Sequence, residues 1–168
     1  NSLELLLELE EYKKNNHFII EWPKGQTLRV KQTVSSKNLS LSIHGKQHWF
    51  EYDGEVAIDE GHALDIKKLM ELLDGSQGRF IPLANGEFIA LTEKFKKQLE
   101  ELRTLSDDNK VYHLSTSSLR GLAEDAGTLQ EDLAWTKHLK KLSAMEKHQP
   151  LIPSTLQAEL RDYQIEGF

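Results

Sequence analysis

Gln164 is the residue whose type and surroundings indicate the most specific chemistry in this chain. It lies in the stretch Leu160-Arg161-Asp162-Tyr163-Gln164-Ile165-Glu166-Gly167-Phe168. A glutamine amide offers two N–H donors and a carbonyl acceptor, and the edge of an adenine base presents an amino donor beside a ring-nitrogen acceptor. The pattern therefore indicates adenine recognition. Because short motifs also arise by chance, the alternative is the start of an amphipathic helix with Gln164 on its solvated surface.

Histidines and hydroxyl groups elsewhere carry weaker indications. His44 and His48 have a spacing that on a helix would place two metal ligands on one face. Gly45 and the alternating pattern around it place them across a turn instead, and no third ligand is obvious, so a metal site is not expected. The remaining histidines are scattered and give no signal: His17, His113, His138 and His148. Residues 115–118, Ser-Thr-Ser-Ser, are typical of a loop with a helix cap rather than of a nucleophile.

The composition limits the classes of protein to consider. The chain has 168 residues, of which 38% are hydrophobic, so it can bury one sizeable core. Its net charge of -6 argues against a diffuse nucleic-acid coat, and a DNA-facing patch would have to be local. The absence of cysteine excludes disulfides and cysteine-based zinc sites. No apolar run approaches the roughly 20 residues of a membrane span, and a cytosolic protein fits.

Alternating apolar residues predict an antiparallel sheet in the first two thirds of the chain. Strands are expected at residues 17–22, 28–31, 39–43 and 110–114. Two hairpins are also expected, because Asp-Gly and Asn-Gly pairs accept the positive φ of two-residue turns. The first pairs 49–52 with 55–58 across Asp53-Gly54. The second pairs 79–84 with 87–91 across Asn85-Gly86.

Apolar residues at helical spacing predict several amphipathic helices. The first three are expected over 2–15, over 66–73 with an end near Gly75, and after a Thr92 cap with inward-facing Phe95, Leu99, Leu102 and Leu105. A short helix around 119–123 should be followed by a longer one, opened by the capping box Thr128-x-x-Glu131 and carrying Leu133, Trp135, Leu139 and Leu142. The predicted fold class is α+β: an antiparallel sheet built from hairpins, packed amphipathic helices and a helical C-terminal third.

The stretch around Gln164 resembles the Q-motif of Swi/Snf-type helicase-like ATPases, in which Leu-Arg-x-Tyr-Gln-x-x-Gly precedes a tryptophan-bearing helix. Leu160, Arg161, Tyr163, Gln164 and Gly167 match, whereas Asp162 stands where the family often has proline. In the family this glutamine reads adenine. The resemblance implies that Gln164, with Tyr163, Arg161 and Leu160 positioning the loop around it, binds the adenine of ATP in the full-length protein only.

A looser resemblance extends upstream. Residues 49–56 and 78–92 resemble the helicase-associated accessory region that precedes the motor in bacterial Swi/Snf-type proteins. Trp135 with Leu139 and Leu142, ahead of a linker bounded by Pro150 and Pro153, fits the same arrangement. The resemblance covers most of residues 17–168. It implies an accessory domain over 1–149, then over 150–168 a linker and the truncated start of the first ATPase lobe.

The function implied by the resemblance is that of a non-catalytic accessory fragment of an ATP-dependent DNA helicase or translocase, which regulates or positions the motor. ATP and magnesium are then cofactors of the full-length parent, and none is expected for this fragment. The implied partners are the ATPase lobes of the same polypeptide and, through the parent, double-stranded DNA. The implied location is the cytoplasm, with nucleoid association as an option. The alternative is a free-standing protein-interaction module with a chance match at its end.

Two further patterns resemble parts of a helicase, but each is better explained by an ordinary structural role. Asp59-Glu60-Gly61-His62 imitates the helicase box that holds magnesium, but it precedes Gln164 and no Gly-x-x-x-x-Gly-Lys-Ser/Thr loop occurs in the chain. We therefore expect an acidic turn between a strand and a helix. A basic cluster could contact DNA or the motor, but most charge runs are solvated faces; it comprises Lys137, Lys140, Lys141, Lys147 and His148.

Overall fold

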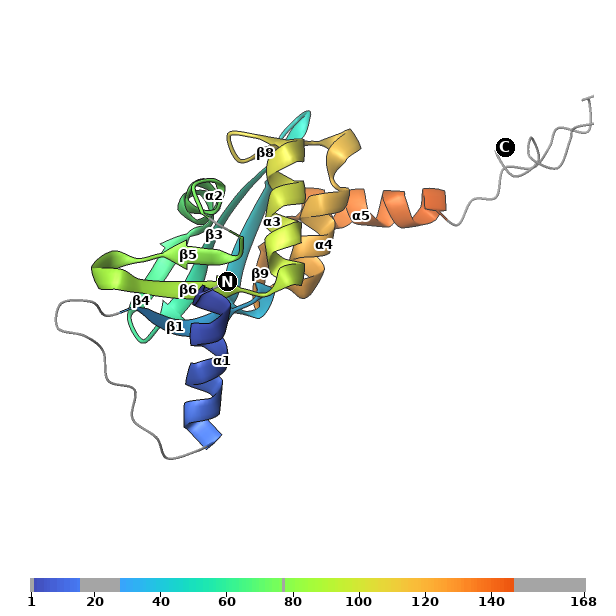
Figure 1. Ribbon diagram of the computed structural model, residues 1–168. Coiled ribbons are helices and arrows are strands. Elements are labelled where there is room, and N and C mark those ends of the chain that lie inside the picture. The colour runs from blue at the N-terminus through green and yellow to red at the C-terminus, as the bar shows by residue number, and fades with distance from the viewer. Residues whose placement is uncertain (1, 16–27, 77, 147–168) are drawn as a thin grey trace, which may run out of the picture.

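The protein has an α+β fold, as predicted, in which helices pack on two sheets (Figure 1). The computed structural model describes residues 2–15, 28–76 and 78–146. The strand predicted over 17–22 and everything predicted for 150–168 lie outside these residues. The helices are α1 (Ser2–Asn15), α2 (Ile66–Asp74), α3 (Glu93–Leu105), α4 (Ser117–Asp125) and α5 (Leu133–Glu146).

The larger sheet has the strand order β7-β8-β3-β2-β9, with β4 paired to β3. Its strands are β2 (Leu39–Gly45), β3 (Trp49–Asp59), β4 (His62–Asp65), β7 (Ser106–Asp107), β8 (Lys110–Tyr112) and β9 (Thr128–Glu131). On β2, Leu39, Leu41 and Ile43 are buried, as predicted, whereas Ser40 is exposed. One face of this sheet is therefore covered and the other is solvated, which is why apolar and polar residues alternate so clearly.

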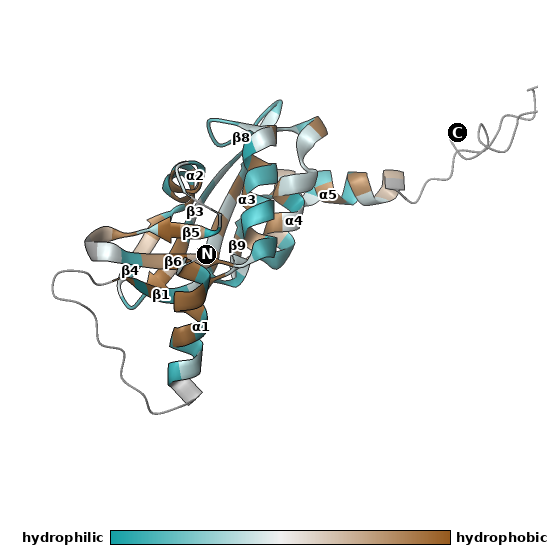
Figure 2. Cartoon of the chain, viewed as in Figure 1, coloured by the Kyte–Doolittle hydropathy of each residue, from teal (hydrophilic) through white to brown (hydrophobic). Residues whose placement is uncertain are grey.

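The smaller sheet has the order β1-β6-β5 and is covered on both faces. Its strands are β1 (Arg29–Val34), β5 (Phe80–Pro82) and β6 (Glu87–Leu91). On β6, Ile89 and Leu91 belong to the main core, whereas Phe88 and Ala90 contact a second cluster. Helix α1 contributes Leu6 to that second cluster, and Leu3 and Leu7 pack against it. Figure 2 shows the hydrophobic segments of α1 in brown.

The helices predicted from apolar spacing are confirmed, with one difference in which side chains face the core. Ile66, Leu69, Met70 and Leu73 of α2 are buried, as are Leu119, Leu122 and Ala123 of α4. Thr92 caps α3, and its hydroxyl accepts a hydrogen bond from the Phe95 N–H at 3.3 Å. Leu105, predicted to face inward, is 40% exposed because α3 ends there and the chain turns into β7.

The hairpin predicted across Asp53-Gly54 is wrong, because β3 runs through both residues as one strand. Gly54 pairs with Leu41 of β2, and the turn lies further on, at Gly61 with φ +87°. A Cβ on Gly54 would lie 3.0 Å from Leu39 Cδ1 and 3.1 Å from the Ser40 carbonyl oxygen. This glycine therefore permits close packing inside the sheet rather than a turn.

The capping box predicted at Thr128 and Glu131 is also wrong, because these residues form β9, which pairs in parallel with β2. Helix α5 begins at Leu133, two residues after the end of β9, and Asp132 between them caps it. Asp132 Oδ1 accepts a hydrogen bond from the Trp135 N–H at 3.0 Å, and Oδ2 accepts one from the Gly45 N–H at 2.7 Å. These backbone hydrogen bonds, first that from Trp135, lower the pKa of Asp132.

The sheets are mixed rather than purely antiparallel. Strand β1 pairs in parallel with β6, and β2 pairs in parallel with β9. The second predicted hairpin is confirmed in its pairing, since β5 is antiparallel to β6, but a 3-10 turn over Ala84–Gly86 replaces the two-residue turn. The predicted helical C-terminal third likewise contains β9 between α4 and α5.

Candidate functional site

The residues predicted to bind adenine, Leu160, Arg161, Tyr163 and Gln164, lie outside the described residues. The structure shows where the other candidate residues lie, and it contains a cleft that the sequence did not indicate. Helix α5 ends at Glu146, so it is the described element nearest in sequence to the Gln164 stretch.

Asp59 and His62 of the helicase-like box face each other across the β3–β4 turn. His62 Nδ1 lies 2.6 Å from Asp59 Oδ1, and Lys31 of β1 forms an ion pair with the same carboxylate. The Lys31 hydrogen bond is the first cause that lowers the pKa of Asp59, ahead of the contact with His62. The box is thus an acidic turn, as predicted, but it joins two strands, and β4 then leads into α2.

His44 and His48 are separated by a change of element. His44 lies on β2 and His48 in the loop before β3, and both side chains are exposed. Within the part of the chain that the structure describes, no group of three histidine, cysteine, aspartate or glutamate side chains is placed to hold a metal ion.

Thr116 stands at the start of α4, where the sequence predicts a helix cap, but its side chain makes a different contact. A 3-10 turn, η3 (His113–Ser115), precedes it, and its hydroxyl is not bonded to a backbone N–H of α4. Thr116 is 2% exposed, and its Oγ1 lies 2.9 Å from Nε2 of His138 on α5. The hydroxyl therefore joins two helices.

His138 belongs to a cluster of four rings from three parts of the fold. Phe50 of β3 lies at the centre, with ring centroids 4.8 Å from His113, 4.9 Å from Trp135 and 5.0 Å from His138. The centroids of His113 and His138 are 5.3 Å apart. The aromatic and imidazole rings thus fix the start of α5 against β3 and η3.

The cluster favours the neutral form of His138. Burial lowers the pKa of His138, and the neighbouring His113 and Lys141 lower it further because each positive charge disfavours another nearby. In the described part of the chain, His113 Nε2 and Trp135 Nε1 are buried without a hydrogen-bond partner. Among the described residues, neither histidine is paired with a carboxylate, the group that orients a catalytic histidine; His138 Nε2 contacts the Thr116 hydroxyl instead.

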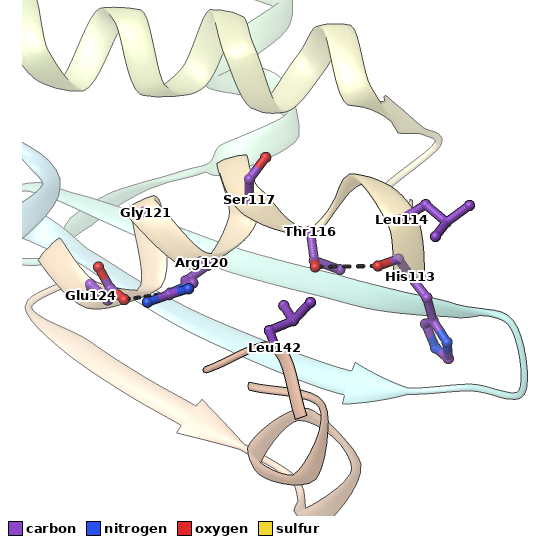
Figure 3. Close-up of a pocket in the computed structure, with 8 residues that line it drawn as sticks. All are labelled: His113, Leu114, Thr116, Ser117, Arg120, Gly121, Glu124 and Leu142. Carbon is purple, nitrogen blue, oxygen red and sulfur yellow. Dashed lines mark hydrogen bonds and ion pairs between the residues drawn. The ribbon is translucent and has the colours of Figure 1, made fainter. Parts of the chain in front are cut away.

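A cleft of about 410 Å³ lies beside this cluster, between α4 and α5. Figure 3 shows Thr116, Arg120 and Leu142 around it, with the Arg120 Nε–Glu124 Oε1 ion pair of 2.8 Å at one end. The cleft is lined by His113, Leu114, Thr116, Ser117, Arg120, Gly121, Glu124 and Leu142. Its mixed apolar and polar lining suits a docked side chain or short segment better than bond-making chemistry.

The lysines of the predicted basic cluster that are described are all solvated. Lys137, Lys140 and Lys141 have exposed side chains on α5, and they form no ion pair with another described residue. Lys147 and His148 lie outside the described residues. The described lysines fit the solvated-face interpretation.

Sequence reasoning did not find this site. His113 and His138 are 25 positions apart and share no motif, yet the fold brings them together. One signal was present: Trp135 and His138 are separated by three positions and therefore share a face of α5. The partners Phe50 and His113, by contrast, come from distant segments, and only the tertiary fold places them there.

Comparison of the chain with protein-family models, with curated proteins and with solved structures finds no match. Across residues 2–15, 28–76 and 78–146, no helix has both the length and the apolar composition needed to cross a membrane.

Proposed function

We propose that this chain is a non-catalytic accessory part of an ATP-dependent DNA helicase or translocase of the Swi/Snf type. The observation that carries the proposal is the stretch Leu160, Arg161, Tyr163, Gln164 and Gly167, with the spacing of the family's Q-motif. In this proposal the accessory domain regulates or positions the motor. Gln164 contributes to adenine binding once the first ATPase lobe is complete, and ATP and magnesium are cofactors of the parent.

The upstream resemblance supports the proposal through the part of the fold where it falls. Residues 49–56 belong to β3, and 78–92 contain β5 and β6. Their apolar side chains, among them Phe50, Tyr52, Ile81 and Ile89, are buried in the main core. The similar residues are therefore those that build a scaffold, which suits an accessory role in a cytoplasmic protein.

The decisive experiment measures ATP hydrolysis by the full-length parent with and without double-stranded DNA, beside the same parent lacking residues 1–149. We expect DNA-stimulated hydrolysis that changes on deletion. If DNA stimulates hydrolysis equally with and without residues 1–149, the parent is still a DNA-dependent motor, but the accessory domain does not regulate it. The absence of hydrolysis under every condition would refute the proposal.

Gln164 can be tested separately. We predict that Gln164→Ala in the full-length parent raises the KM for ATP by about tenfold, because one site-specific pair of hydrogen bonds contributes roughly 1–2 kcal/mol. Steady-state hydrolysis measures this effect, and the folding of residues 1–146 should not change. An unchanged KM would remove Gln164 from adenine binding.

A second candidate function, a free-standing protein-interaction module, is favoured by the exposed Leu114 beside the α4–α5 cleft. The reading frame beyond Phe168 separates the two. A phosphate-binding loop within a few dozen residues supports the motor, whereas a stop codon supports the module.

A further inference from the structure

Helix α5 carries an apolar stripe that continues beyond the surface covering it. Trp135, Leu139, Leu142 and Met145 recur at helical spacing along one side. Trp135 is fully buried, Leu139 and Leu142 are half-buried, and Met145 is 62% exposed. Figure 1 shows the outer end of α5 extending past α4. The core therefore covers only the first half of the stripe.

The uncovered half adjoins further apolar surface. Leu142 and Leu114 line the same cleft, and Leu114 is fully exposed. Met145 lies on the next turn of α5 after Leu142, so its side chain extends the same surface. Single exposed apolar residues are ordinary, but adjoining ones that border a cleft are typical of a contact surface.

Gly121 provides an independent observation at the same place. It lies inside α4 and lines the cleft, although glycine is disfavoured in a helix interior relative to alanine. A Cβ at Gly121 would meet no atom within 4 Å, and its φ is not positive. Nothing in the described structure requires glycine here, so the missing side chain leaves room for another segment to approach α4 closely.

The positive charge beside this surface indicates which kind of partner it could bind. Lys141, next to Leu142 on α5, is exposed within a chain of net charge -6. A partner with acidic side chains next to apolar ones would match both features. DNA would match the positive charge of Lys141, but its phosphates would leave Leu114 and Met145 without an apolar contact.

We propose that the surface formed by Leu114, Gly121, Leu142 and Met145, with Lys141 beside it, docks the first ATPase lobe of the same polypeptide. The contacting segment of the lobe carries apolar side chains with acidic neighbours. This inference rests on the proposed function. Leu160, the first motif residue, follows Glu146 by 14 positions, which span at most roughly 50 Å. Such a short tether gives a high effective concentration, so a small surface suffices.

The test places the photo-crosslinker p-benzoylphenylalanine at position 145 of the full-length polypeptide. The matched control places it at Leu133, which is 77% exposed at the other end of α5 and faces away from the stripe. After irradiation, mass spectrometry should find position 145 linked to peptides beyond Phe168 of the same polypeptide, and position 133 should not be. Links to DNA or to another protein, links only within residues 1–146, or no links at all would overturn the docking surface.

A paired substitution gives a functional readout. Leu114→Gln with Met145→Gln should change DNA-stimulated ATP hydrolysis by about fivefold or more, the effect of removing an interface anchor. Leu5→Gln with Leu133→Gln, also at exposed apolar positions, should leave the rate as it was. Equal rates for both pairs would count against the docking surface alone, since the motor would still hydrolyse ATP. A parent without any hydrolysis would instead refute the proposed function.

Discussion

His138 shows how a residue without any motif acquires a defined chemical setting. Its ring packs against Phe50 and Trp135, and its Nε2 contacts the buried Thr116 hydroxyl. Burial and neighbouring positive groups lower its pKa below the usual 6.5. The neutral form of the imidazole is therefore the form that the folded state stabilises.

This setting predicts a pH dependence of stability. Because the folded pKa is lowered, the unfolded chain binds more protons than the folded chain as the pH falls through 6.5. The contribution of His138 is therefore complete above pH 6.5 and is lost progressively below it. Urea unfolding at pH 7.5 and 5.5 should show a smaller free energy of unfolding at 5.5, and His138→Gln should reduce this difference.

The matched control is His48→Gln, since His48 has an exposed side chain in the loop before β3. This variant should keep the wild-type difference between the two pH values. If His138→Gln and wild type lose equal stability between pH 7.5 and 5.5, the buried ring is not the source of the pH dependence.

At the scale of elements, β3 illustrates a conflict between a local turn signal and a longer pattern. Asp53-Gly54 is a good hairpin turn by composition. Yet Phe50, Tyr52, Val56 and Ile58 keep the same period of two on both sides of it, and all four are buried. A turn there would break that period and uncover the residues that β2 and the helices bury, so the continuous strand is favoured.

Asp53 offers a test of the strand. It is exposed and pairs with Ser42, so Asp53→Thr should stabilise the protein by up to about 1 kcal/mol, the span of strand propensities. Asn109→Thr is the contrast, because Asn109 has φ 60° in the β7–β8 turn. There a β-branched residue should cost roughly 1–2 kcal/mol. Thermal or urea unfolding measures both, and a destabilising Asp53→Thr would contradict the strand.

The sequence predicts helices and strands well where the pattern is local. It predicts them poorly where pairing with a distant strand determines the conformation. Spacing alone indicates α2, α3 and α4, because one side of each is apolar. Residues 128–131 fit a helix cap as well as a strand, and only the edge of β2 selects the strand. The α4–α5 cleft is unpredictable for the same reason: its residues meet only after the sheet has formed.

At the scale of the whole molecule, the apolar interior is divided into two clusters by the smaller sheet. The main core lies between the two sheets and α2 to α5. The second cluster joins α1 to Val30, Phe80 and Ala90. Arg79 strengthens this attachment with two hydrogen bonds to Glu4, Nε to Oε1 at 2.9 Å and Nη2 to Oε2 at 2.6 Å. Helix α1 should therefore detach without unfolding the main core.

Leu6→Asp tests this division. Leu6 is 8% exposed in the second cluster, and a carboxylate there removes the apolar contact and adds a desolvation cost. We predict that hydrogen exchange in α1 becomes at least about 100-fold faster, equivalent to about 3 kcal/mol, while β2 and β3 keep their protection. Leu5→Asp, at a 57% exposed position, is the control. Loss of protection throughout the protein would mean that the two clusters unfold together.

The parallel pairing of β9 with β2 sets the order in which the protein can fold during synthesis. Asp132, which directly follows β9, accepts a hydrogen bond from the N–H of Gly45, 87 positions earlier. On the ribosome, β2 and β3 can pair as soon as both have emerged, but the outer edge of β2 waits until residues 128–132 leave the exit tunnel. At synthesis rates of about 5–20 residues per second, that edge stays open for roughly four seconds or longer. The nascent chain is therefore most exposed to aggregation and to chaperones before α5 is made, and the ring cluster around Phe50 closes last.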